Sequence, residues 1–209
     1  MNLPNVNHMK NIFATVASTL ICLALIALIF IYAGWVNIAA DVPHNPIVFS
    51  VLEIARERAI QRDASLVSVP SDISDPERVR RGSGNYDAMC VNCHLSPGQN
   101  NSEIRLGLYP TPPNLTEKEQ GVNFSQQSKI RFWVIKHGIK ASGMPAWSKG
   151  GMSDQEIWDL VSFLQQLPEM DEHRYRILVH TSDGHHHEGI NHPHDLSNQH
   201  HHETDMHQK

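Results

Sequence analysis

The pattern of hydrophobic and polar positions divides the chain into an apolar N-terminal run, a helical middle and a polar end. No charged residue occurs between Asn11 and Ile38, and the dense apolar core runs from Ile12 to Val36. At a rise of 1.5 Å per residue, a helix of that length exceeds the roughly 30 Å hydrocarbon core of a bilayer. The pattern therefore predicts a transmembrane anchor over residues 1–40.

A cleaved secretory signal is the alternative interpretation of this segment. Ala39 and Ala40 resemble a cleavage site, but the apolar core of a signal is shorter, about 7–15 residues. Lys10 precedes the apolar run and Asp41 follows it. This order favours an N-terminus inside the cell and the rest of the chain outside. We therefore expect an uncleaved single-pass anchor.

Residues 41–74 are predicted to form a stalk helix and a linker. An apolar stripe at helical spacing follows Pro46, at Ile47, Val48, Val51, Leu52, Ala55 and Ala59. Both a plain stalk and a partner-binding helix fit this stripe. The next segment, SLVSVPSDISDP, has the Ser, Pro and Asp content of a linker.

The next helix is predicted to begin at Asp75-Pro76, an acidic N-cap followed by proline at the first helical position. Gly82, Tyr86 and Cys90 are four residues apart and therefore share one face of this helix. A glycine inside a helix costs about 1 kcal/mol relative to alanine. We expect close approach of another helix to compensate for this cost.

Two further helices are predicted. One lies between Phe124 and Gly138 and is strongly apolar. The other begins with a capping box, in which Ser153 is the N-cap and Glu156 is the third helical residue, and it ends before Pro168. Its apolar face is formed by Ile157, Leu160, Val161 and Leu164.

Composition narrows the function classes. The 209 residues carry a net charge of −5 and show no basic cluster of the kind that binds nucleic acid. Three cysteines are too few for a disulfide-rich secreted scaffold. Neither a P-loop nor a Rossmann glycine pattern is present in the sequence. The unusual residue is histidine, with 15 copies, of which 11 lie from His173 to His207.

The most informative motif is Cys90-Val91-Asn92-Cys93-His94. The spacing C-x-x-C-H is typical of covalent c-type haem attachment, in which two thiols bind the haem vinyl groups and the histidine binds the iron. A thioredoxin-like disulfide would need a βαβ pattern, and a zinc site would need a second pair of ligands. Neither is apparent, so we expect one covalent haem c.

Met144 is the candidate for the second axial ligand of the iron. It lies in the segment Gly143-Met144-Pro145, where the proline restricts the loop that presents the thioether. Histidine and methionine together raise the haem potential relative to two nitrogen ligands. The alternatives are His137, which would give a bis-histidine centre, and the remaining methionines of this region, Met89, Met152 and Met170.

The segment from about Asp75 to Leu167 resembles a monohaem class I cytochrome c, and we assign residues 75–171 to the cytochrome c domain. The resemblance rests on the order of Gly82 and Tyr86, the C-x-x-C-H motif, the segment Pro113-Asn114-Leu115, the Met144 loop and the final helix. It implies an all-α fold of three to four helices around one haem. It also implies that the first and last helices cross, with Gly82 and Tyr86 facing Leu160 and Phe163.

The resemblance further implies a partner for the proximal histidine. The carbonyl of Pro113 would accept a hydrogen bond from the ring nitrogen of His94 that does not bind iron, although Pro110 and Pro112 lie close by in the sequence. We also place Tyr109 and Trp147 as candidate residues of the haem pocket, with ordinary packing as the alternative.

Two protein ligands leave no open position on the iron, so we expect an electron carrier rather than an enzyme. The main hypothesis is a membrane-tethered carrier on the periplasmic side of a bacterial inner membrane, exchanging single electrons with respiratory proteins. A metal-handling protein that couples the haem to the polar end is a second hypothesis. A cytochrome subunit of a dehydrogenase or oxidase complex is a third.

Residues 172–209 are predicted to be a mostly disordered tail, since they contain few apolar residues to bury. Neutral imidazole binds Cu, Zn and Ni, so the tail is a candidate metal-binding segment; a solvated polar tail is the alternative. The candidate ligands are His185, His186, His187, His192, His194, His200, His201, His202 and His207. Protonation of imidazoles with a pKa of about 6.5 would weaken such binding near pH 6.

Overall fold

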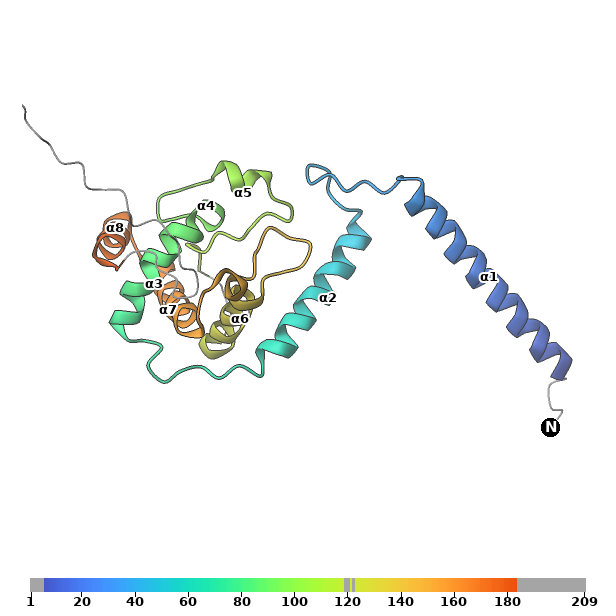
Figure 1. Cartoon of the computed structure of the whole chain (residues 1–209), viewed down its shortest axis with the longest axis horizontal. Helices are drawn as coiled ribbons and strands as arrows, with labels where there is room; N and C mark the ends of the chain where they lie inside the picture. Colours follow the sequence, from blue (N-terminus) through green and yellow to red (C-terminus); the bar gives the residue numbers. More distant parts are fainter. Residues whose placement is uncertain (1–5, 119–120, 122, 184–209) are drawn as a thin grey trace, which may run out of the picture. The chain divides into compact units, whose positions relative to one another are not determined.

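The computed structural model describes residues 6–118, 121 and 123–183, and the regular secondary structure within them is helical. The chain divides into two compact units, Met1–Pro43 and His44–Lys209. The all-α class predicted from the sequence is confirmed. Figure 1 shows the second unit as a bundle of helices joined by long loops.

The first unit contains the helix α1, Val6–Tyr32. Its part from Met9 to Tyr32 is long and apolar enough to cross a membrane, a test that a signal sequence also passes. The helix ends before Val36, where the apolar run stops, because Gly34 adopts a left-handed conformation with φ 71°. The ring of Trp35 then packs edge-on against Phe30, with centroids 5.3 Å apart.

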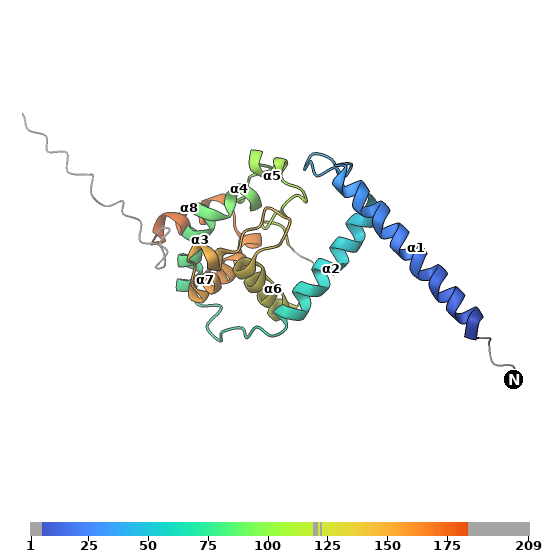
Figure 2. The same cartoon turned by 45° about the vertical axis from the view of Figure 1, so that its right-hand side comes forward.

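The second unit begins with α2, Pro46–Ala64, which packs against α6, Phe124–His137. The Asn45 side chain caps α2 by accepting a hydrogen bond from the backbone N–H of Ile47 at 3.0 Å. In both views the second end of α2 lies beside α6 (Figures 1 and 2). The predicted stalk helix is therefore a packed element of the second unit.

The centre of the fold is the crossing of α3, Pro76–Met89, and α7, Asp154–Gln166. A Cβ atom at Gly82 would lie 2.1 Å from the carbonyl oxygen of Asp159, so only glycine allows this approach. Next to it, the rings of Tyr86 and Phe163 lie 5.2 Å apart. The crossing that the sequence predicts is present, and so is the predicted capping box at Ser153.

A buried ion network holds the same two helices together. The Arg78 guanidinium donates to Asp159 at 2.8 Å and to Asp72 at 2.8 Å, and Arg81 donates to Asp159 at 2.7 Å. The side chains of Arg78 and Asp159 are only 5% and 4% exposed. The Asp159 carboxylate thus joins two cations of α3 to α7.

Short elements complete the second unit. They are α4 (Val91–His94), α5 (Glu103–Gly107), η1 (Trp147–Gly150) and η2 (Leu167–Glu169). The hydrophobic core gathers around α7, whose residues from Ile157 to Leu164 are all buried. Partly buried residues of α4 and of the loops before α6 and after it pack against this core.

The start of the tail differs from our prediction. Residues Glu172–Thr181 form the helix α8, which packs against α3 (Figure 2). Tyr175 is 6% exposed, donates to the Asp87 carboxylate at 2.8 Å and contacts the rings of Tyr86 and Phe163. Tyr175 and its long-range partner Asp87, together with Leu178 and Val179 packed against the core, therefore extend the domain beyond residue 171. Residues 184–209 lie outside the described part of the chain.

Candidate functional site

The C-x-x-C-H motif lies at the junction of α3 and α4. Cys90 ends α3, and its carbonyl accepts hydrogen bonds from the backbone N–H groups of Cys93 and His94 at 3.0 and 2.9 Å. This single turn brings both thiols and the imidazole to one place. The two cysteines are not joined by a disulfide, and both are half-buried.

The free Cys90 side chain is a protonated thiol. Burial, reinforced by the neighbouring Cys93, raises the pKa of this thiol to about 12. A redox-active cysteine instead has a lowered pKa. Among the described residues, no group of three His, Cys, Asp or Glu side chains is arranged to hold a metal ion.

His94 is oriented by the segment that the resemblance indicates. Its Nδ1 lies 2.9 Å from the carbonyl oxygen of Pro113, and because a carbonyl only accepts, Nδ1 carries the hydrogen. Nε2 is therefore the nitrogen available to a metal. Burial lowers the pKa of His94, against the opposing effect of the Pro113 hydrogen bond. Burial thus favours the neutral imidazole, and the Pro113 hydrogen bond orients its ring; a neutral, oriented imidazole is the form that binds iron.

The helix α5 connects the C-x-x-C-H motif to the proline segment that contains Pro112 and Pro113. The sequence analysis missed this connection. The Ser102 hydroxyl donates to the carbonyl of Asn92, inside the C-x-x-C-H motif, and accepts from the backbone N–H of Arg105 at 3.1 Å. Arg105 Nε donates to the carbonyl of Pro112 at 3.1 Å. The only sequence signal was Ser102 as an N-cap three residues before Arg105.

Met144 lies in the loop between α6 and η1. Its carbonyl accepts from the backbone N–H of Ile139 at 3.1 Å, and its own N–H donates to Ser142 Oγ at 3.2 Å. Gly138 has φ 66°, and a Cβ atom there would lie 2.7 Å from the Pro145 backbone. The loop is thus folded tightly on the end of α6, and Met144 is half-buried against the hydrophobic core.

The alternative ligands have other surroundings. Met152 and Met170 are 3% and 7% exposed and belong to the core cluster. His137 is exposed, and its ring lies 5.0 Å from that of Trp133. Met89 is one residue from the attachment motif and packs against the core. Among these residues, Met144 combines partial burial against the core with a position in a loop separate from the attachment motif.

Tyr109 and Trp147 have different surroundings. The Tyr109 hydroxyl accepts from the backbone N–H of His44 at 3.2 Å, and its ring contacts those of His44 and Phe49. Trp147 is half-buried at the edge of the core and begins η1. Tyr109 thus connects the loop before Pro113 to the start of α2.

The donor set fits a covalent haem. Two thiols and an imidazole with a free Nε2 occupy one turn, and a thioether is presented by a separate loop. Cys90, Met144 and Trp147 are partly buried against the same hydrophobic cluster. An apolar boundary of this kind suits a haem, whose potential depends on burial and on the identity of its ligands.

Comparison with known proteins decides the nature of the domain. Residues 77–164 match the family model described as Cytochrome C oxidase, cbb3-type, subunit III. Residues 77–164 are a c-type cytochrome domain. The cytochrome domain implies haem c and haem-based electron transfer. Neither a curated protein nor a solved structure was found to match the chain.

The predicted metal-binding histidines of the tail, His185 to His207, all lie outside the described residues. Of the 11 clustered histidines, His173 and His180 are described, and both are exposed on α8. They are seven residues apart on the helix, about 10 Å along its axis, which is too far to share one ion.

Proposed function

We propose that this chain is a membrane-tethered electron carrier, in which Cys90 and Cys93 bind one haem c covalently and His94 and Met144 are the axial ligands of its iron. The observation that carries the proposal is the cytochrome family match over the segment that contains all four residues. When bound, the haem supplies an iron that alternates between the ferric and ferrous states by gaining or losing one electron.

His94 and Met144 are the residues of this chain that would hold that iron. The Pro113 carbonyl fixes the ring of His94, and the tight loop around Ser142 and Gly138 fixes Met144. With both side chains held in place, little reorganisation would accompany electron transfer. An iron held by both residues would have no place for oxygen or peroxide, so we infer a carrier and not an enzyme.

The apolar helix α1 supports a location at the bacterial inner membrane. Its length and composition suit a single-pass anchor, and the charges at Lys10 and Asp41 favour a periplasmic cytochrome domain. Donor and acceptor would then be respiratory redox proteins of the same membrane.

Spectroscopy tests the haem assignment. The haem should resist acid–acetone extraction, and the oxidised protein should show a weak methionine–iron band at the red end of the spectrum. Met144→Ala should abolish that band and lower the potential by on the order of 0.1 V. Met170→Leu, a volume-conserving change in the core, is the matched control and should keep both. Haem that extracts freely, or a band that survives in Met144→Ala, would contradict the assignment.

A cytochrome subunit of an oxidoreductase complex is a second candidate function. The description of the matching family, a subunit of cbb3-type cytochrome c oxidase, favours it. Purification in mild detergent at native expression distinguishes the two. A subunit should elute with a large partner, whereas a carrier should elute alone.

Metal binding by the tail remains a prediction from the sequence. A chain truncated after Asp183 should lose any stoichiometric Cu, Zn or Ni that the full chain binds, and it should keep its haem spectrum. Equal metal content in the two proteins would exclude the tail as a metal-binding segment.

A further inference from the structure

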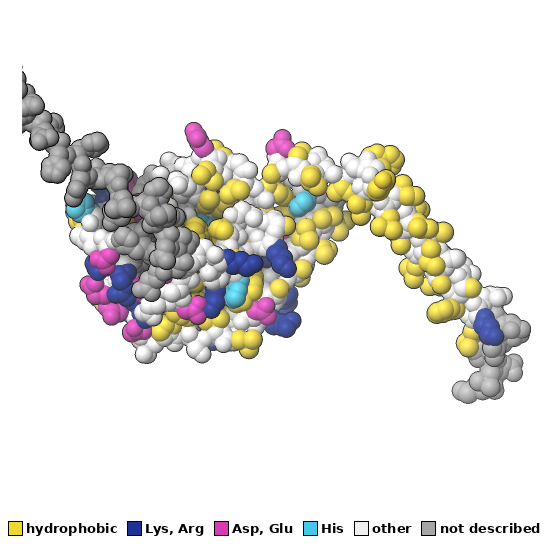
Figure 3. Space-filling view, in the orientation of Figure 1, with side chains coloured by type: hydrophobic (Ala, Val, Ile, Leu, Met, Phe, Trp, Pro, Cys, Tyr) yellow, Lys and Arg dark blue, Asp and Glu magenta, His cyan; other side chains and the backbone are white. Residues whose placement is uncertain are grey.

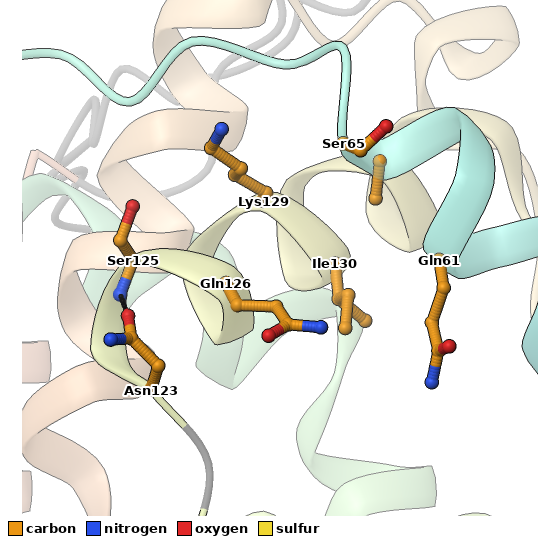
Figure 4. Close-up of a pocket in the computed structure, with 8 residues that line it drawn as sticks. Gln61, Ser65, Asn123, Ser125, Gln126, Lys129 and Ile130 are labelled. Carbon is orange, nitrogen blue, oxygen red and sulfur yellow. Dashed lines mark hydrogen bonds between the residues drawn. The ribbon is translucent and has the colours of Figure 1, made fainter.

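The helix α2 has an inner face that is fixed to the cytochrome domain. Phe49 contacts Tyr109, with ring centroids 6.4 Å apart, and Ala64 is 1% exposed at the other end. Figure 4 shows that second end, where Gln61 and Ser65 lie across an open pocket of about 330 Å³ from Gln126 and Ile130 of α6. The inner face is therefore held at both ends.

The opposite face of α2 is exposed and apolar. Ile47, Val51 and Ile54 are 76%, 60% and 60% exposed, and their spacing of four and three residues places them on one side of the helix. Val48 and Leu52 lie beside them, 48% and 53% exposed. A contiguous patch of this kind is uncommon on the free surface of a protein and marks an interaction site.

The charges on this face are basic. Continuing the same spacing along α2 leads to Arg58 and Arg62, and both are exposed, although Arg62 also lies 3.6 Å from the Asp63 carboxylate. The acidic residues Glu53 and Glu57 project from another side of the helix, where Arg56 pairs with them at 3.7 and 3.1 Å. Figure 3 shows hydrophobic side chains over the first part of α2 and basic ones toward its second end.

We propose that this outer face of α2, with Ile47, Val51 and Ile54 followed by Arg58 and Arg62, lies on a bilayer surface that contains anionic lipids. The inference rests on the proposed membrane tether. Apolar side chains enter the boundary between headgroups and acyl chains, and arginine attracts anionic headgroups, each basic residue contributing about 1 kcal/mol.

The length of the tether favours the membrane over other occupants. Residues 33–45 connect α1 to α2 and span at most about 45 Å when fully extended. The apolar end of α2 is the end attached to this tether. The bilayer is thus always within reach of the face, whereas a second copy of the chain would have to be recruited.

Thiol accessibility in lipid nanodiscs tests the proposal with the full haem-loaded chain. Cys22 is replaced by serine, so that a cysteine introduced at Val51 is the sole free thiol once haem occupies Cys90 and Cys93. The rate of modification by a membrane-impermeant maleimide is measured in discs that hold one chain each. Ile177→Cys on α8, 49% exposed in the native chain, is the control position.

Protection that depends on lipid is the expected result. Discs of phosphatidylcholine with phosphatidylglycerol should slow modification at position 51 about tenfold relative to detergent, and the control should change little. Discs of phosphatidylcholine alone should slow modification at position 51 less. The double variant Arg58→Gln, Arg62→Gln should be modified at the same rate in the two kinds of disc.

Two results would overturn the proposal. Equal reactivity at position 51 in discs and in detergent would show that the face stays in water. Protection only in discs that hold two chains would assign the face to a second copy. The haem spectrum and retention of the chain in the disc are recorded in every arm, so failure of the tether or of haem binding is seen separately.

Discussion

The crossing of α3 and α7 and the ligand side of the cytochrome domain are built in opposite ways. At the crossing, backbone approach, aromatic contact and a buried ion network leave the side chains around Gly82 almost without solvent. On the proposed ligand side, His94 and Met144 are half-buried; the Pro113 carbonyl orients the His94 ring, and two backbone hydrogen bonds hold Met144 in its loop. The crossing of α3 and α7 therefore stabilises the fold, whereas the side with His94 and Met144 has the looser construction that suits a bound haem.

Removing the buried Asp159 carboxylate should destabilise the crossing of α3 and α7 more than any other change considered. Asp159→Ala leaves the Arg78 guanidinium buried without its main partner on α7, which should lower the free energy of unfolding by about 3–5 kcal/mol. Urea denaturation measures it. Arg176→Ala, which removes an exposed pair with Glu172 at 3.7 Å, is the control and should cost less than about 0.5 kcal/mol. Equal losses in the two variants would contradict the role of the network.

The close approach at Gly82 is the next test. Gly82→Ala forces the backbone of α7 away from a Cβ atom that would lie 2.1 Å from the Asp159 carbonyl, and should cost about 3 kcal/mol. Gly107→Ala on α5 is the matched control, because nothing lies within 4 Å of the added methyl group. Thermal unfolding should separate them clearly. A Gly82→Ala protein as stable as Gly107→Ala would show that the helices can move apart freely.

On the ligand side we expect a change in potential rather than in stability. Arg105 places a positive charge next to the segment that orients His94, and a cation favours the ferrous iron. Arg105→Gln should lower the potential by about 40 mV, or about 1 kcal/mol for one electron. Redox titration measures the shift, and Arg105→Lys, which keeps the charge, should recover most of it. An unchanged potential in Arg105→Gln would exclude the charge effect.

The smallest effect concerns the exposed end of the ion network. The hydrogen bond from Arg78 lowers the pKa of Asp72 below its usual value of 3.8. The pair therefore stabilises the fold above that value, and the contribution is lost as the pH falls through the lowered pKa. Asp72→Asn should be less stable than the native chain at about pH 6, with the gap closing in strong acid. If the difference in stability between Asp72→Asn and the native chain stayed constant over this pH range, it would arise from packing and not from the ion pair.

Local signals predicted much of this molecule. The proline and acidic N-cap before α3 and the capping box of α7 are short-range features, and both helices begin where these residues stand. The spacing of Gly82 and Tyr86 correctly indicated the crossing, because the requirement for glycine at a close contact is visible in the sequence.

Long-range partners limited the prediction elsewhere. The segment of α8 was assigned to the tail because the chain from residue 172 contains few apolar residues. Its contacts are long-range: Tyr175 pairs with Asp87, which is 88 residues away, and Leu178 and Val179 pack against the core. The same holds for the Arg105 contact with the Pro112 carbonyl and for the Tyr109 contact with His44. None of these contacts follows from the periodicity of its own segment.

The contact between Tyr109 and His44 has a kinetic consequence. Since it holds His44 and the start of α2 on the domain, only residues 33–43 are left as a tether to α1. In the proposed membrane-tethered carrier, so short a tether would confine the domain to a small volume above its anchor, and the effective concentration presented to a neighbour in the membrane would be in the millimolar range. Electron exchange with such a neighbour would depend on how often the two anchors meet in the plane of the membrane, not on how much of the protein is dissolved in the surrounding water.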